Sequence, residues 1–130
     1  MISTREIATL SEFRYQLARF QRFSVAASRG AGLTQTQYLL LLHTKGYAGR
    51  DWATVGELAK RLQASPHGTA ALVGRCVALG LVVKVRSAED GRRVEVHLTA
   101  CGHRLVGRVA TLHRNELRSL RKVIRVAHVS

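Results

Sequence analysis

The segment "RSAEDGRRVEVHLT", Arg86 to Thr99, contains the residues best suited to binding a charged partner. Its arginines carry a permanent positive charge and several N–H donors, a combination that recognises phosphate groups and base edges. The alternating run "VEVHL" and the preceding β-branched run "VVKVR" predict the two strands of a hairpin. Ser87 to Gly91 supplies residues typical of a turn. The sequence therefore predicts a hairpin that holds Arg92 and Arg93 at its tip.

Two cysteines and the histidines near one of them are the other groups that could do chemistry. Cys101, near the start of the last predicted helix, has two interpretations: a peroxide sensor activated by the positive end of that helix, or a small buried residue. His97, Cys101 and His103 are close enough in sequence to share a metal, but they lack the ligand spacing of a structural zinc site. Cys76 falls on a core position, where packing is the expected role. We expect neither a metal nor a cofactor.

The composition is strongly basic, with 21 Lys and Arg against 8 Asp and Glu and a formal net charge of +13. Such a charge attracts polyanions, which makes nucleic acid the leading partner and an anionic membrane surface the second. The sequence contains no phosphate-binding loop, nucleophile motif or paired carboxylates, so we do not expect an enzyme. No apolar run could span a bilayer, and the first residues are charged where a signal peptide is apolar. We expect a cytoplasmic protein.

Capping boxes mark the starts of three predicted helices, because each pairs a cap hydroxyl with a Glu or Gln three residues later. They are formed by Ser3 with Glu6, Thr34 with Gln37, and Thr54 with Glu57. The first helix is predicted to run to about Ser28. The run "YLLLLHTKG" predicts a second helix that is buried on more than one side and ends before Gly46. The run "VGELAKRLQ" predicts a short amphipathic third helix, joined to the second by a loop, "YAGRDWA".

Ser65 and Pro66 predict the start of a fourth helix, since serine caps well and proline fits the first helical position. This helix is predicted to end at Gly80. Its predicted core residues are Leu72, Val73, Cys76 and Leu79. Beyond Thr99, a single last helix carries an apolar stripe whose period drifts. The predicted fold is mainly α with a small β-hairpin wing, in the order helices, two strands, one helix.

Two short helices separated by the tight turn Gln63 to Ser65 are typical of a helix-turn-helix. Alone, this pattern fits an ordinary helical hairpin equally well. A β-hairpin directly after the second helix favours a winged helix-turn-helix, in which that helix enters the major groove and the hairpin reaches the neighbouring backbone or minor groove. The arginines at the hairpin tip would then meet a narrow, strongly negative groove.

Three runs resemble the MarR family of transcriptional regulators: "LTQTQYLLLL", "VGELAKRLQASPHGTAALVGRCVALGLV" and "EDGRRVEVHLTACG". The most specific piece is Asp90 and Arg92 as D-x-R, followed at the family's spacing by Val96, Leu98-Thr99 and Gly102. The resemblance covers residues 33–104. It implies sequence-specific binding to double-stranded DNA, usually as a repressor that a small-molecule effector releases from a pseudo-palindromic operator.

The resemblance also implies an organisation for the whole chain. Residues 1–130 would form a single MarR-like domain, in which residues 33–99 are the winged helix-turn-helix lobe. The helical regions 1–30 and 100–130 would interlock with a second copy to form a homodimer. Against the family's pattern, Ala70-Ala71 stands where a polar residue is common, Gly91 stands at a wing position often held by arginine, and the last helix lacks a clear break.

The expected DNA contacts follow from which residues the core leaves free. Ser65 and the N–H groups of the first turn suit a phosphate, as does Arg75, whereas His67 could contact a base or a phosphate or be merely solvated. In the wing, Asp90 is expected to orient the Arg92 guanidinium through a charge-assisted hydrogen bond. The full predicted set is Ser65, His67, Gly68, Ala70, Ala71, Arg75, Arg86, Asp90, Arg92 and Arg93.

Two further features have more than one interpretation. An effector pocket is expected near Phe13, Leu17, Phe20, Tyr38 and Trp52, although apolar residues there are also ordinary core. The basic run Arg114, Arg118, Arg121, Lys122 and Arg125 is a solvated face, or it meets acidic residues of a partner chain or DNA phosphates. The alternative function for the whole chain is a general nucleic-acid-coating protein in which charge alone drives binding.

Overall fold

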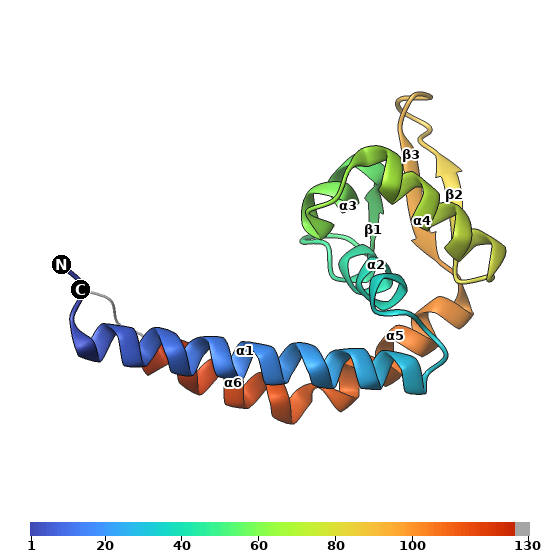
Figure 1. The fold of residues 1–130 in the computed structure, drawn as a ribbon. Coiled ribbons are helices and arrows are strands. Elements are labelled where there is room, and N and C mark those ends of the chain that lie inside the picture. The colour runs from blue at the N-terminus through green and yellow to red at the C-terminus, as the bar shows by residue number, and fades with distance from the viewer. Residues whose placement is uncertain (127–130) are drawn as a thin grey trace.

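Two helices form one edge of the molecule, and the remaining elements form a lobe above them (Figure 1). The computed structural model describes the backbone of residues 1–126 and the side chains of residues 1–121. The elements are α1 (Thr4–Gly30), α2 (Gln35–Lys45), β1 (Trp52–Thr54), α3 (Val55–Leu62), α4 (Pro66–Ala78), β2 (Val82–Arg86), β3 (Val94–Leu98), α5 (Ala100–Leu112) and α6 (Arg114–Val126). We call α1 with α6 the arm, and α2 to α5 with the strands the lobe.

All the predicted helix starts are confirmed, because each is set by short-range hydrogen bonds. The three capping boxes, Ser3 with Glu6, Thr34 with Gln37, and Thr54 with Glu57, have both of their reciprocal bonds. Ser65 caps α4, and Pro66 occupies its first turn. Local sequence thus determines where the helices of the lobe begin.

The sheet has three strands rather than the two predicted, in the order β1-β3-β2. Both β1 and β2 pair antiparallel with β3; Trp52 lies opposite His97, and Val82 opposite Leu98. The missed strand, β1, lies in the segment predicted as loop. It is three residues long, too short to show an alternating pattern, and its extended form is stabilised by pairing with a strand more than 40 residues later in the sequence.

The core of the lobe contains most of the predicted residues, including Leu72, Val73 and Cys76. Leu79 was predicted to be buried, and this was wrong, because 57% of its surface is exposed. Leu79 is the C-cap of α4, and Gly80 then turns the chain with a positive φ of 72°. The turn places Leu81 and Val82 in the core instead.

The prediction of one unbroken last helix was also wrong, since the chain divides into α5 and α6 at His113. The N–H of His113 bonds to Ala110 at three-residue spacing, which tightens the end of α5. Beyond this point α6 packs along α1, whereas α5 packs on α2 and β3. The drifting period of the apolar stripe reflects this change of packing partner. Among the described residues, no helix has the length and apolar character needed to cross a membrane.

Candidate nucleic-acid interface

The recognition helix of the predicted motif is α4, and its first turn is exposed. The Ser65 hydroxyl accepts a hydrogen bond from the Gly68 N–H at 3.0 Å, so its own proton remains available to donate. Thr69 is buried and donates to the Ser65 carbonyl at 2.8 Å, which anchors the helix start. The residues predicted to face DNA, which are Ser65, His67, Gly68, Ala70, Ala71 and Arg75, are all exposed.

The turn before α4 is held in a left-handed conformation. Gln63 has a positive φ of 54°, and the following Ala64 N–H bonds to the Ala59 carbonyl at 2.9 Å. This ends α3 after two turns and redirects the chain so that α4 packs across α3. The arrangement is a helix-turn-helix, with the apolar faces of both helices directed into the lobe and the start of α4 directed outwards.

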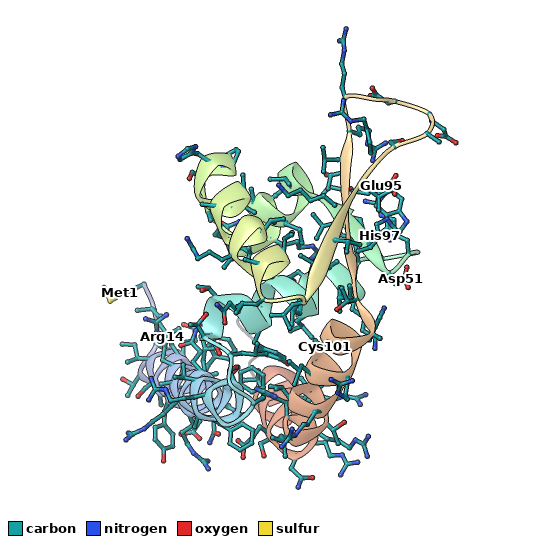
Figure 2. The ribbon with its side chains drawn as sticks, turned by 90° about the vertical axis from the view of Figure 1, so that its right-hand side faces the viewer. Met1, Arg14, Asp51, Glu95, His97 and Cys101 are labelled. Atoms are coloured by element: carbon teal, nitrogen blue, oxygen red, sulfur yellow. The ribbon has the colours of Figure 1, made fainter. Side chains whose placement is uncertain are left out.

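The wing is the hairpin of β2 and β3, which extends beyond the rest of the lobe (Figure 1). Figure 2 shows side chains at its tip extending away from the protein. Arg86 donates from Nη1 to the Gly91 carbonyl at 3.0 Å, and Ser87 N–H bonds to the Arg93 carbonyl at 2.9 Å. The predicted wing residues Arg86, Asp90, Arg92 and Arg93 are exposed. The tip is therefore an ordered turn with basic side chains on its surface.

The expected role of Asp90 was wrong in one respect. Its Oδ1 accepts a hydrogen bond from the backbone N–H of Arg92 at 3.0 Å, and its own N–H donates to the Ser87 hydroxyl at 3.3 Å. Asp90 therefore shapes the backbone of the turn, as aspartate does in Asx turns, and leaves the Arg92 guanidinium free of an ion pair within the described residues. The donors of that guanidinium remain available to a partner.

A junction ties α4, the wing and α5 together. The Thr99 hydroxyl donates to the Gly80 carbonyl at 2.7 Å and also caps α5 by accepting from the Gly102 N–H at 3.1 Å. A Cβ at Gly102 would stand 2.2 Å from the Leu81 carbonyl oxygen, so a side chain cannot be accommodated there without movement of the backbone. This close approach gives a physical reason for the Leu-Thr-x-x-Gly run at residues 98–102.

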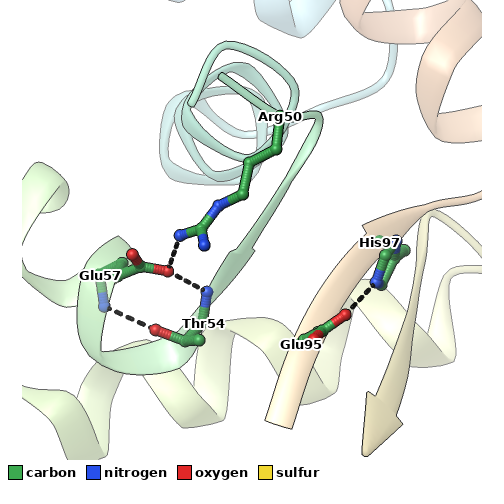
Figure 3. Close-up of polar contacts among 5 residues, drawn as sticks. All are labelled: Arg50, Thr54, Glu57, Glu95 and His97. Atoms are coloured by element: carbon green, nitrogen blue, oxygen red, sulfur yellow. Dashed lines mark hydrogen bonds and ion pairs between the residues drawn. The ribbon is translucent and has the colours of Figure 1, made fainter. Parts of the chain in front are cut away.

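Arg50 braces the start of α3 by an ion pair with Glu57 (Figure 3), and two aromatic rings pack against it. No sequence pattern indicated these contacts. The Arg50 guanidinium carbon lies 3.9 Å from the centre of the Trp52 ring and 4.4 Å from that of Tyr47. Arg50 also pairs with the carboxylate of Glu57, whose Oε1 accepts from the Thr54 N–H at 2.9 Å. Sequence patterns detect the capping box of Thr54 and Glu57. They do not detect Arg50, because its contacts with the two rings depend on how the loop folds.

Hydrogen bonding and burial shift the pKa of Glu57 in opposite directions. Burial raises the pKa of this carboxyl group, but hydrogen bonds from Thr54, Arg50 and Tyr47 outweigh burial and hold the pKa at about 2. Glu57 therefore carries its charge at any physiological pH. The charged carboxylate fixes both the N-terminus of α3 and the position of the Arg50 ring stack.

A cavity of about 390 Å³ lies between the arm and the lobe, where the effector pocket is expected. Three predicted residues, Leu17, Phe20 and Tyr38, line it, but Phe13 and Trp52 do not. Trp52 lies on β1 and stacks on His97 at 5.7 Å between ring centres, in the lobe sheet. Trp52 does not line this cavity because it sits on a strand of the lobe sheet, which nothing in the sequence indicated.

The two cysteines and His97 were the other groups that could do chemistry, and all three lie in the lobe. Cys76 is fully buried in the core, and this burial raises the pKa of its thiol. Its role is therefore packing, as expected. His97 pairs with Glu95 at 2.9 Å, and Figure 2 shows the two together on one side of the sheet near Asp51. Cys101 is half-buried in the first turn of α5. The part of the chain that the structure describes holds no group of three or more His, Cys, Asp or Glu that could bind a metal.

The basic run of the last helix is described only in part. Arg114, Arg118 and Arg121 are exposed on α6, and Arg118 donates to the Asn115 side chain at 3.4 Å. Lys122 and Arg125 lie outside the residues whose side chains the structure describes. The exposed positions are consistent with each interpretation: a solvated face, a face for a partner chain, or contact with DNA phosphates.

Comparison with known proteins finds similarity to one family, both in sequence and in structure. The MarR family profile matches residues 31–93, which span α2 to the wing tip. A MarR repressor from Listeria monocytogenes is 25% identical, with a TM-score of 0.67 over 96% of this chain and 83% of its own. A MarR family protein from Bacillus stearothermophilus is 24% identical, with a TM-score of 0.75 over 98% and 86%. No curated protein matches the sequence.

A third similar structure contains nucleic acid. It is a MepR mutant from S. aureus bound to an oligodeoxyribonucleotide, 21% identical, with a TM-score of 0.65 over 86% of this chain and 80% of its own. The family match, the mainly α fold and the winged helix-turn-helix agree with one another. The chain therefore has the winged-helix fold of MarR family proteins, and its residues 31–93 match the profile of that family, whose members are DNA-binding transcription regulators.

Proposed function

We propose that the chain is a sequence-specific regulator that binds double-stranded DNA through α4 and the wing. The observation that carries this proposal is the placement of an exposed, capped helix start and an arginine-bearing turn on one rigid lobe. The formal net charge of +13 favours approach to a polyanion. The oligonucleotide-bound MepR structure supports the same use of this fold.

The contacts divide between the two elements. On α4, the Ser65 hydroxyl and Arg75 contact phosphates, while His67 contacts a base edge or a phosphate. Because Gly68, Ala70 and Ala71 are small, α4 can approach the groove floor closely. These residues recognise thymine methyl groups or DNA shape and make no hydrogen bonds to bases. In the wing, Arg92 and Arg93 enter the neighbouring groove, and Arg86 and Asp90 hold the turn from which they project.

The protein acts as a homodimer. In the single chain, α1 fully buries only two residues, Ser24 and Ser28, although it is 27 residues long. Its apolar residues Ile7, Leu10 and Tyr15 are more than half exposed. A second copy packed against the arm would cover this surface and place two α4 helices on successive faces of a pseudo-palindromic site.

The regulation is repression of transcription in the cytoplasm, relieved by a small molecule bound in the cavity between arm and lobe. A ligand there touches α1, α2 and α5 at once, so it can change how the lobe is held relative to the arm. We propose no catalytic role for the chain, since its residues form a binding surface rather than a reaction centre.

Fluorescence anisotropy tests the proposal. The purified protein is titrated against a duplex from the upstream region of its own gene and against a scrambled duplex, each over a salt series. A regulator is expected to prefer one sequence by roughly a thousandfold at physiological salt.

Two further results separate the candidates. Equal binding to the two duplexes, lost together as salt rises, favours the alternative of a general nucleic-acid-coating protein driven by charge. To exclude the case in which the operator lies elsewhere, selection from a random duplex library is run in parallel. Failure to enrich any sequence would contradict the proposed regulator.

A further inference from the structure

The arm carries more than half of the net positive charge of the chain. Its two helices, α1 and α6, contain ten Lys and Arg against three Asp and Glu, which gives +7 of the total +13. The arm lies along one edge of the molecule, and the wing tip lies at the opposite edge (Figure 1). A duplex held by α4 and the wing therefore leaves the charge of the arm unused.

Part of this charge forms a row on α6. Arg114, Arg118 and Arg121 are four and three residues apart, which places them on one side of the helix, with the first two about 6 Å apart along its axis. All three are exposed. Glu116 and Leu120, which are half-buried, lie on the opposite side, where α6 packs on the rest of the chain. We call these three arginines the α6 row.

The α6 row has no ion-pair partner among the described residues. Arg118 donates to the Asn115 side chain at 3.4 Å, which is a long hydrogen bond to a neutral group. Like charges four residues apart repel each other, so α6 is stabilised when an anion neutralises the row. The row is therefore suited to a partner with closely spaced negative charges.

A second copy of this chain does not supply enough negative charge for the arm. Its arm would bring three carboxylates, those of Glu6, Glu12 and Glu116, to ten cations. The carboxylate of Glu6 already accepts from the Ser3 N–H in its capping box, and Glu116 lies on the side of α6 away from the row. Pairing between two copies therefore leaves the arm strongly positive.

A membrane surface also fits the α6 row poorly. Helices that lie in a membrane interface insert a broad apolar face beside their basic residues. Among the described residues of α6, Leu117 is the exposed large apolar side chain, and it also lines the cavity between arm and lobe. One leucine does not form such a face, so charge alone must hold the partner.

We propose that the α6 row binds the phosphate backbone of a second DNA duplex, so that the protein bridges two duplexes. A guanidinium donates two N–H groups to a phosphate at once, and a duplex carries one negative charge per about 1.7 Å of its axis. Such contacts need no particular base sequence. Binding by the row is independent of the lobe, whereas the bridging role rests on the function proposed above.

Capture of a second duplex on beads tests the bridge. A biotinylated duplex with the sequence enriched in the selection described above is fixed to beads, saturated with protein and washed, so that both lobes of a dimer are engaged. A fluorescent duplex of unrelated sequence is then added at about 50 mM salt, where phosphate contacts are strong. The wild-type protein is expected to retain the fluorescent duplex. No retention would overturn the proposal.

Two variants with the same change of net charge locate the surface. The first carries Arg114→Gln, Arg118→Gln and Arg121→Gln. The control carries Arg22→Gln, Arg29→Gln and Lys45→Gln, which are exposed positions away from the row. The first is expected to retain at least about tenfold less fluorescent duplex with operator affinity unchanged, and the control as much as the wild type. Equal retention by the two variants would overturn the proposal.

Two further arms separate this proposal from its neighbours. Vesicles of phosphatidylglycerol and phosphatidylcholine in equal parts are offered in place of the second duplex; binding of vesicles but not of DNA through the row would overturn the proposal in favour of a membrane surface. If the selection enriches no sequence, the unrelated duplex is also fixed to the beads. Retention lost with the row but kept in the control would then contradict the proposed regulator and support the arm surface.

A measurement on the wild type keeps the test valid if a variant fails to fold. Phenylglyoxal modifies accessible arginines, and mass spectrometry reports which ones have reacted. In protein saturated with the first duplex, the α6 row is expected to react, and addition of the second duplex is expected to protect it. A row that reacts equally with and without the second duplex would overturn the proposal.

Discussion

The lobe and the arm differ in how completely each buries its own apolar residues. In the lobe, Leu40, Leu58 and Val96 are fully buried, and the core extends through α5 to Val109. In the arm, α1 leaves Ile7 and Leu10 more than half exposed. A core that is closed within one chain can hold a DNA-binding surface rigid, whereas an exposed apolar helix needs another surface to cover it. The comparison separates the part of the molecule proposed to bind DNA from the part proposed to join two copies.

The largest expected effect comes from breaking the junction that closes the lobe. Gly102→Ala places a Cβ against the Leu81 carbonyl oxygen, and we expect a loss of about 3 kcal/mol or more in the free energy of unfolding. Urea denaturation followed by circular dichroism measures it. Gly107→Ala is the matched control on the same helix, since a Cβ there meets nothing within 4 Å, and it is expected to stabilise α5 slightly. Similar effects at both positions would mean that the close approach at Gly102 is unimportant.

The second effect tests whether the arm joins two copies. Leu10→Glu introduces a charge on the exposed apolar side of α1 and is expected to convert a dimer into a monomer with a folded lobe. Loss of bivalent contact is expected to weaken operator binding about a hundredfold. Analytical ultracentrifugation measures the oligomeric state. Arg5→Glu adds a carboxylate on the far side of the same helix and should leave the dimer intact. A wild-type protein that sediments as a monomer would refute the proposed assembly.

The third effect compares the same change of charge in the two regions. Arg92→Ala removes an exposed guanidinium from the wing, and Arg19→Ala removes one from the arm. We expect the first to weaken operator binding about tenfold and the second less than twofold, with folding unchanged in both. Anisotropy at one fixed salt concentration gives both affinities. If the two variants lose affinity equally, net charge rather than position drives binding, and the coating protein becomes the better description.

The smallest expected effect concerns how low pH weakens the ion pair between Arg50 and Glu57. The pKa of Glu57 in the folded protein, about 2, lies below its ordinary value of 4.5, so the charged form stabilises the fold. This stabilisation is complete above pH 4.5 and is lost as the pH falls towards 2. Glu57→Gln keeps an amide in the capping box but loses the ion pair, at an expected cost of about 1 kcal/mol at pH 7.

The matching control is the capping box of the arm. Glu6→Gln makes the same neutralisation at the start of α1, where the ion pairs of the described residues include none to Glu6. Chemical denaturation of both variants at pH 7 and pH 3 measures the difference. The cost of Glu57→Gln is expected to shrink at pH 3. A cost that is the same at both pH values would show that the ion pair with Arg50 does not stabilise the lobe.

The sequence predicted the elements whose signals are local and contiguous. The hairpin and its exposed arginines followed from alternation and turn residues, and all ten candidate contacts lie at exposed positions. The binding of these residues to DNA remains a prediction. Leu79 and the role of Asp90 were mistaken, because helix periodicity does not show where a helix ends, and charge pairing does not show which N–H a carboxylate meets.

Hydrogen bonds between residues two to four apart can be predicted from sequence because few conformations satisfy them, and they determined the helix starts and the wing turn. Contacts between residues that are distant in sequence depend on the complete packing. Only the tertiary structure decided these contacts. They pair β1 with β3, bring Leu81 against Gly102 and place Arg50 against two aromatic rings. They also divide the last helix at His113, whose buried imidazole lies among three aromatic rings and has one nitrogen without a hydrogen-bond partner among the described residues.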